Sequence, residues 1–162
     1  MNQQYISING WKAKIRFSSA HVIPEYEKCG RLHGHTYAVH TKIYGKPDDK
    51  GIIIDFSLLK QILHEITDAL DHKVLIPENS PSIELTKEKD QIIFSSLGKL
   101  YSFPASDCKL LPLDSTSAEN LSVYILTQLE KNLEQCTNVE SIEIGVDEGF
   151  GQGAYITKTL NK

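Results

Sequence analysis

The segment Cys29-Gly30-Arg31-Leu32-His33-Gly34-His35 constrains this chain more than any other stretch of its sequence. Side chains alternate between the two faces of a β-strand, so His33 and His35 point the same way if this segment is extended. Their imidazoles can then reach one metal ion, and Gly34 between them lets the backbone approach closely. His21, a short distance upstream, is a candidate third nitrogen ligand from a neighbouring segment. We therefore predict a metal site at His21, His33 and His35.

Cys29, four residues before His33, decides what kind of metal site this is. It is either a fourth ligand in a closed structural site, or a nucleophile or base beside an ion that keeps an open position. Three neutral imidazoles with one open position are typical of catalytic zinc. Structural zinc knots commonly use more cysteines, at regular Cys-x-x-Cys spacing. The pattern therefore favours an open, catalytic Zn²⁺ site.

Length, net charge and cysteine content narrow the class of protein. The length of 162 residues suits one domain, which we expect to span residues 1–162. A net charge of -4 and a pI near 5.8 argue against nucleic acid or an anionic membrane as the main partner. We find no apolar run near the roughly 18 residues of a membrane helix and no signal-peptide layout at the start. The three scattered cysteines do not form a disulfide framework, so we expect a cytoplasmic protein that binds neither nucleic acid nor membrane.

Hydrophobic periodicity predicts strands, a helix, strands, a helix and strands, which indicates an α+β fold with a mainly antiparallel sheet. The expected strands cover residues 5–17, 35–46, 142–146 and 154–160. One helix is expected at 57–70, capped by Asp55 or Ser57. A capping box opens the second helix, with Thr116 as N-cap and Glu119 three residues on. Between them, segments 82–86 and 91–95 flank a charged tip and predict an inserted hairpin within residues 77–112.

Asp71 and His72, just past the first expected helix, form a second candidate group. An aspartate beside a histidine can fix its tautomer or stabilise its imidazolium. The alternative is an ordinary helix end, where a cationic side chain interacts favourably with the helix dipole. His40 and His64 read as ordinary surface or strand residues.

Glu148 is the third candidate, because it continues the alternation of Ile144 and Val146 and should point inward with them. A carboxylate there needs a partner such as a cationic or amidine-like ligand edge, since burying it unpaired is costly. The alternative is that the strand ends at Val146 and that Asp147-Glu148 is a solvated turn.

Together these residues resemble the 6-pyruvoyl-tetrahydropterin synthase superfamily over most of the chain. The motifs that carry the resemblance are Phe17-Ser18-Ser19-Ala20-His21, Cys29-x3-His33-Gly34-His35, Asp55-Phe56-x-x-Leu59-Lys60, Leu70-Asp71-His72-Lys73, Ser117-Ala118-Glu119-Asn120-Leu121 and Val146-x-Glu148. The gap of three residues between cysteine and His-Gly-His is most similar to the 6-carboxy-5,6,7,8-tetrahydropterin synthases of queuosine and archaeosine precursor synthesis. Biopterin-pathway members have a longer gap, and folate-pathway relatives put a glutamate near the cysteine position.

The resemblance implies the tunnelling fold: antiparallel sheets backed by two main helices, assembled into a barrel-forming trimer or hexamer with sites between subunits. It implies a pterin substrate, 7,8-dihydroneopterin triphosphate, and Zn²⁺ on the three histidines. It also implies a catalytic set and substrate contacts. The catalytic set is Cys29 as proton acceptor, Asp71 and His72 as its relay, and Glu148 as pterin anchor; the other substrate contacts are Thr116, Ser117 and Glu119.

Departures from the family pattern keep alternatives open. Residues 77–112 replace a shorter connection, and Ser115-Thr116-Ser117 stands where Pro-Thr is usual. The turn after Glu148 is about one residue shorter than usual, so Asp147 is an alternative anchor. The other functions to weigh are a 6-pyruvoyl-tetrahydropterin synthase, a dihydroneopterin side-chain aldolase and a non-catalytic zinc-stabilised pterin-binding protein.

Overall fold

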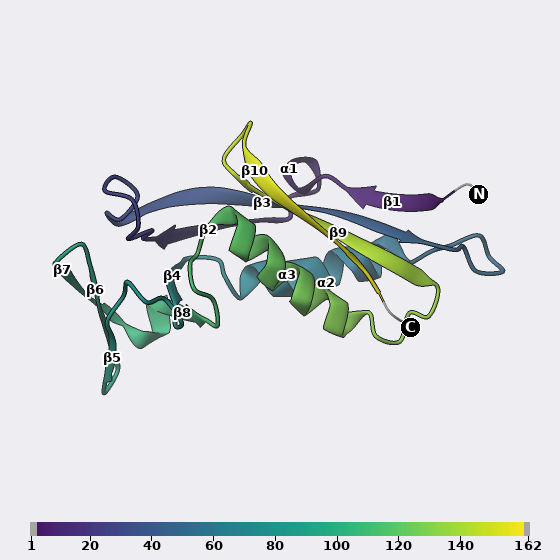
Figure 1. Ribbon diagram of the computed structural model, residues 1–162. Helices are drawn as coiled ribbons and strands as arrows, with labels where there is room; N and C mark the ends of the chain where they lie inside the picture. The colour runs from purple at the N-terminus through teal and green to yellow at the C-terminus, as the bar shows by residue number, and fades with distance from the viewer. Residues whose placement is uncertain (1–2, 161–162) are drawn as a thin grey trace.

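The computed structural model describes residues 3–160, in which two long helices cover one face of a seven-stranded sheet (Figure 1). The strands lie in the order β10 (Gly153–Thr159), β9 (Val139–Glu148), β3 (His33–Gly45), β2 (Arg16–His21), β4 (Lys73–Pro77) and β8 (Cys108–Leu111), with β1 (Gln4–Ile8) also paired to β3. β4 pairs in parallel with β2 and β8, and the other pairs are antiparallel. The predicted α+β class with a mainly antiparallel sheet is therefore confirmed, whereas β4 and β8 had no counterpart among the expected strands.

The two long helices are α2 (Phe56–Asp68) and α3 (Ala118–Asn132). Asp55 caps α2, since its side chain accepts hydrogen bonds from the N–H groups of Ser57 and Leu58 at 2.6 and 3.0 Å. Ser117 caps α3 by accepting from the N–H of Asn120. The prediction that Thr116 caps α3 is therefore wrong by one residue.

The main core lies between these helices and the sheet. It includes Leu59, Leu63, Leu121, Ile125 and Leu129 from the helices and Phe17, Tyr37, Val39, Ile142 and Ile144 from the strands. Within residues 3–160, none of the helices has both the length and the apolar character needed to cross a membrane.

The start of the chain differs from the single strand expected at 5–17. β1 and β2 pair one after the other with β3, and the one-turn helix α1 (Gly10–Ala13) lies between them. Asn9 caps this turn by accepting from the N–H of Lys12. Gly10 packs so closely on β3 that a Cβ there would lie 2.4 Å from the carbonyl oxygen of Val39. One helical turn is too short to show its own periodicity, so the alternation of the flanking strands hides it.

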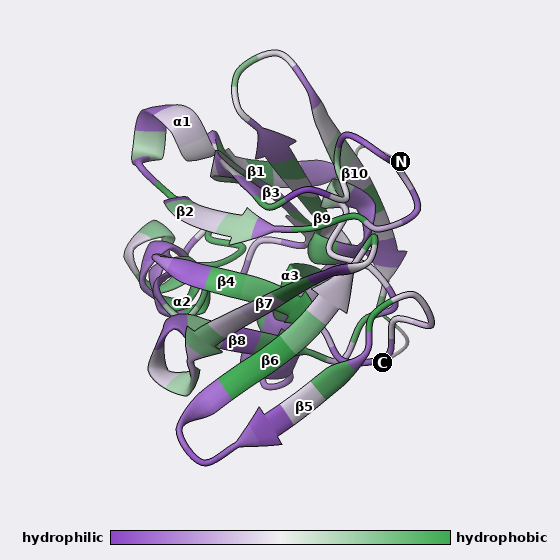
Figure 2. Cartoon of the chain, turned by 90° about the vertical axis from the view of Figure 1, so that its left-hand side faces the viewer, coloured by the Kyte–Doolittle hydropathy of each residue, from purple (hydrophilic) through white to green (hydrophobic). Residues whose placement is uncertain are grey.

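Residues 77–112, called the insert below, form a second small sheet (Figure 2). β5 (Leu85–Glu88) and β6 (Gln91–Ser96) make the expected hairpin, and β7 (Lys99–Pro104) adds a third strand that we did not predict. A 3₁₀ turn, Ala105–Asp107, then leads into β8 of the main sheet. A second apolar core lies under the insert and joins Ile83, Ile92 and Phe94 to Val22 and Ile76 of the main sheet region.

Candidate metal centre and substrate cavity

Strand pairing brings the three histidines together. His21, the last residue of β2, lies directly opposite His33, the first residue of β3, and His35 follows on the same face. One ligand atom from each ring lies within 4.8 Å of the others. Among residues 3–160 this is the group that meets the geometric requirement for holding a metal ion.

Backbone carbonyls orient two of these rings. A carbonyl can only accept a hydrogen bond, so Nδ1 of His21 donates to the oxygen of Thr116 at 3.0 Å, and Nδ1 of His33 donates to the oxygen of Arg31 at 2.7 Å. Metal-binding histidines characteristically donate their second ring N–H in this way, which fixes the tautomer. Nε2 of both rings then remains available for a metal ion, so the residues present fit one.

Burial shifts the pKa values of two side chains at this centre, His21 and Tyr37. Burial, with a smaller contribution from His33, lowers the pKa of His21 to about 4. His21 is therefore neutral at neutral pH, the form that binds metal. The hydroxyl of Tyr37 lies 3.4 Å from Nε2 of His21, and burial together with the charge of Glu148 raises the pKa of Tyr37. We did not single out Tyr37 from the sequence, although it continues the alternation of His33 and His35 along β3.

A cavity of about 470 Å³ contains four of the predicted site residues. Cys29, Ser117, Glu119 and Glu148 all line it. Glu148 also links the cavity to the metal centre, because its Oε2 lies 3.9 Å from Nε2 of His35. The volume is within the range of small-molecule sites, roughly 300–1,000 Å³. Thr116 is instead fully buried against the His21 ring.

Asp147 is turned away from this cavity. Its Oδ2 accepts hydrogen bonds from Nε1 of Trp11 at 2.8 Å and Nε2 of His40 at 2.9 Å. The N–H of Gly10 donates to the other ring nitrogen of His40, which fixes the tautomer that donates to Asp147. Asp147 is thus paired with side chains of its own chain, whereas Glu148 lines the cavity.

The Asp71–His72 pair does not line the cavity that contains Cys29. Nδ1 of His72 donates to Asp71 at 2.7 Å, and Asp71 also accepts from the N–H of Ser18 at 2.7 Å. Burial alone would raise the pKa of Asp71, but the hydrogen bonds from Ser18 and His72 hold it below its usual range. The His72 side chain is 85% exposed, and its φ of 55° is uncommon for a residue with a side chain. His72 borders a separate hollow of about 620 Å³, which is also lined by His35 of the metal centre.

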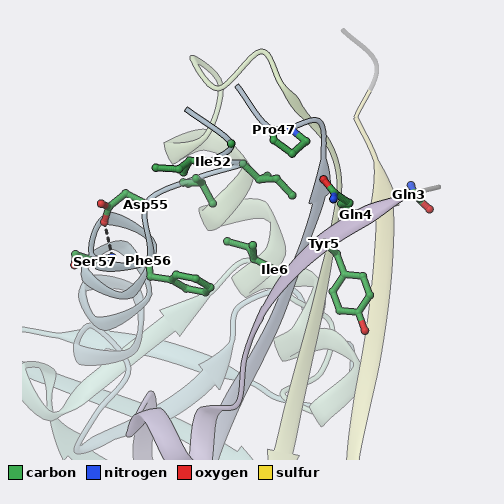
Figure 3. A pocket seen from close by; sticks show the side chains of 12 residues that line it. Gln3, Gln4, Tyr5, Ile6, Pro47, Ile52, Asp55, Phe56 and Ser57 are labelled. Atoms are coloured by element: carbon green, nitrogen blue, oxygen red, sulfur yellow. Dashed lines mark hydrogen bonds between the residues drawn. The ribbon is translucent and has the colours of Figure 1, made fainter. Parts of the chain in front are cut away.

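A further cavity of about 590 Å³ lies between β1 and the start of α2 (Figure 3). Ile6, Ile52 and Phe56 give it apolar walls, and Asp55 is turned toward Ser57 as the helix cap. None of the residues lining this cavity is a histidine or a cysteine, so it does not contain the candidate chemistry.

Comparisons of sequence identify the family. Residues 11–158 match the family model described as 6-pyruvoyl tetrahydropterin synthase. A Methanocaldococcus jannaschii protein, provisionally named 6-carboxy-5,6,7,8-tetrahydropterin synthase, is 38% identical over 158 residues, which cover 96% of this chain and 97% of the relative. The 6-carboxy-5,6,7,8-tetrahydropterin synthase of Haemophilus influenzae is 32% identical over 123 residues, covering 72% of this chain and 79% of the relative.

Solved structures agree. The Plasmodium falciparum 6-pyruvoyl tetrahydropterin synthase superposes with a TM-score of 0.89 at 31% identity, covering 99% of this chain and all of the other. The Plasmodium vivax enzyme of the same name has a TM-score of 0.88 at 26% identity with the same coverage. This chain therefore belongs to the 6-pyruvoyl tetrahydropterin synthase family of pterin-processing enzymes.

Proposed function

We propose that this chain is a zinc-dependent 6-carboxy-5,6,7,8-tetrahydropterin synthase, a lyase that acts on 7,8-dihydroneopterin triphosphate in queuosine or archaeosine precursor synthesis. The observation that carries the proposal is that Cys29 shares one cavity with Glu148, which lies 3.9 Å from one of three histidines grouped closely enough to hold a metal ion. The names of the relatives from Methanocaldococcus jannaschii and Haemophilus influenzae support the choice of product.

Each residue of the cavity has a distinct task in this reaction. Glu148 accepts two neighbouring N–H groups of the pterin edge, as a carboxylate accepts a bidentate guanidinium. Zn²⁺ held by the three histidines would acidify the side-chain hydroxyls of the substrate and the adjacent C–H. The Cys29 thiolate takes up the proton released there. Ser117 and Glu119 line the cavity and contact the substrate, whereas Thr116 acts through the orientation of His21.

The Asp71–His72 pair serves the cavity of a neighbouring copy in a trimer or hexamer. Asp71 holds the His72 ring in one tautomer, and the exposed ring can contact a neighbouring chain. His72 then relays the proton to and from Cys29 across the interface. A site shared between two chains would give the pair a role in catalysis although His72 and Cys29 line different hollows within one chain.

Mixing two inactive variants tests this sharing. Cys29→Ala and His72→Ala are each expected to lose turnover, and mixed oligomers made by co-expression should regain roughly a quarter of the wild-type rate, because intact sites reassemble across a symmetric interface. Mixed oligomers that form but stay inactive would show that the two residues do not work across an interface.

Product identification tests the reaction itself. The protein is incubated with Zn²⁺ and 7,8-dihydroneopterin triphosphate, and the products are identified by mass. A 6-carboxypterin with acetaldehyde supports the proposal, whereas glycolaldehyde with a hydroxymethylpterin indicates the aldolase. Pterin binding without conversion would indicate a non-catalytic binding protein and refute the proposal.

A 6-pyruvoyl-tetrahydropterin synthase is the second candidate. The superposition on the Plasmodium falciparum enzyme of that name, at a TM-score of 0.89, favours it. Its pyruvoyl product has a different mass from the carboxylated one, so the same incubation separates the two candidates.

A further inference from the structure

The insert reaches the loop that contains Cys29. This loop, residues 22–32, connects β2 to β3 and is called the Cys29 loop below. It closes on itself through hydrogen bonds from the N–H of Ile23 to the oxygen of Cys29 and from the N–H of Gly30 to the oxygen of Tyr26, both 2.7 Å long. Figure 1 places the loop and the β6–β7 turn at the same end of the molecule.

Two consecutive carbonyls tie the Cys29 loop to the rest of the chain. The oxygen of Arg31 accepts from the His33 ring, which belongs to the metal centre. The oxygen of Gly30 accepts from the hydroxyl of Ser96 at 2.8 Å, and Ser96 is almost fully buried at the end of β6. A buried hydrogen bond across 66 residues of sequence fixes the residue directly after Cys29 to the insert.

Side-chain packing also connects the insert to the Cys29 loop. A Cβ built on Gly30 would lie 2.4 Å from Cδ1 of Leu97, so the Leu97 side chain lies directly on the backbone beside Cys29. At the other end of the loop, Val22 is buried in the second apolar core together with Ile92 and Phe94. The insert therefore holds the Cys29 loop at both of its ends.

The β6–β7 turn adopts an unfavourable conformation to make this contact. Leu97 and Gly98 have φ values of 52° and 72°, which is the pattern of a type I′ turn. Asn-Gly or Asp-Gly is preferred there, because a bulky residue at positive φ is strained. Such strain persists where the surroundings impose it and is concentrated at functional sites. The contact of its side chain with Gly30 explains why a leucine occupies this strained position.

We propose that the β6–β7 turn of the insert sets the position of the Cys29 thiol in the substrate cavity, with Ser96 and Leu97 as positioning residues. This inference rests on the proposed role of Cys29. It gives residues 77–112 a part in the reaction, because a displacement of about 1 Å at a reacting group can cost on the order of a hundredfold in rate.

Two substitutions separate positioning from simple stabilisation. Ser96→Ala removes the hydrogen bond to Gly30, and Ser95→Ala is the matched control, since Ser95 alternates to the other face of the same strand. Leu97→Asn removes the contact with Gly30 and also installs the preferred Asn-Gly turn, so its melting temperature should hold or rise. If Leu97 only stabilises the fold, Leu97→Asn should be fully active.

The measurements are kcat, KM, zinc content, melting temperature and the rate at which iodoacetamide alkylates Cys29, with Cys136 as internal reference by peptide mass. We expect Ser96→Ala and Leu97→Asn to lower kcat by about tenfold or more while KM and zinc content stay near wild type. The alkylation rate of Cys29 should change relative to that of Cys136, and Ser95→Ala should match the wild type.

The inference is overturned if Leu97→Asn matches the wild type in both kcat and Cys29 alkylation. Cys29→Ala, measured in the same experiment, distinguishes failure of the positioning inference from failure of the proposed function. If Cys29→Ala is inactive while Leu97→Asn is normal, the positioning role is wrong and the proposed function stands. If Cys29→Ala is as active as wild type, the proposed role of Cys29 is wrong, and the positioning inference is overturned with it.

Discussion

Replacing Glu148 with glutamine tests which acid at the end of β9 holds the pterin. The carboxylate can accept two N–H bonds, whereas an amide accepts at only one atom and turns its NH₂ group toward a ligand donor. A hydrogen bond to a charged group contributes about 1.5–3 kcal/mol, so Glu148→Gln should weaken pterin binding roughly tenfold to a hundredfold. Glu148 lies at the cavity edge, with His35 3.9 Å away, so its loss of charge should hardly affect folding.

Asp147→Asn is the matched comparison, and the structure predicts the opposite outcome for it. Asp147 accepts from Trp11 and His40 at one oxygen, and an asparagine oxygen there can accept from both donors but carries no negative charge. Weakening two charge-assisted hydrogen bonds to neutral ones costs about 1–3 kcal/mol of unfolding free energy. For a chain of this size each kcal/mol lowers the melting temperature by about 2–4 °C. Pterin affinity should change little.

The assay is a titration of each variant with sepiapterin or biopterin, beside a thermal melt at one protein concentration, since oligomers melt in a concentration-dependent way. The expected result is a loss of affinity for Glu148→Gln and a loss of stability for Asp147→Asn. If Asp147→Asn shows the larger loss of affinity, the assignment of Glu148 as anchor is wrong and Asp147 holds the ligand.

Three further outcomes are expected. Cys29→Ala should keep zinc and fold but lose turnover by roughly 10²–10⁴-fold, the usual cost of removing a positioned general base; kcat within a few fold of wild type would place the base elsewhere. Metal analysis should find one zinc per chain, removed by a chelator together with activity, and X-ray absorption that detects a sulfur ligand at about 2.3 Å would contradict the open site. Ser117→Ala should lower the unfolding free energy by about 1 kcal/mol through loss of the α3 cap, and an unchanged melting temperature would show that the cap contributes nothing.

The shared face of His33 and His35 could be predicted from sequence because it depends on local alternation. His33 and His35 are two residues apart on one strand, and any extended conformation places them on one face. The start of α3 could also be predicted to within one residue, since polar residues before an apolar periodic segment mark a helix start. These signals require no knowledge of distant contacts.

Other features depend on contacts that no local pattern encodes. β4 and β8 are short, and their parallel pairing depends on the strands that lie beside them. The partners of Asp147 are more than a hundred residues away in the sequence, so His40 read as an ordinary strand residue. Leu97 at positive φ hid the β6–β7 turn, because the residues that normally signal such a turn are asparagine and aspartate.

The capping of α3 by Ser117, rather than by Thr116, has a physical consequence for the metal centre. The carbonyl of an N-cap residue accepts the first hydrogen bond of its helix, and that of Ser117 does so from the N–H of Leu121. If Thr116 were the cap, its carbonyl would instead be directed along the helix toward the N–H of Asn120. Because the helix begins at Ser117, the oxygen of Thr116 accepts from Nδ1 of His21 and leaves Nε2 for a metal ion. The choice of cap residue and the tautomer of a metal-centre histidine are therefore set together.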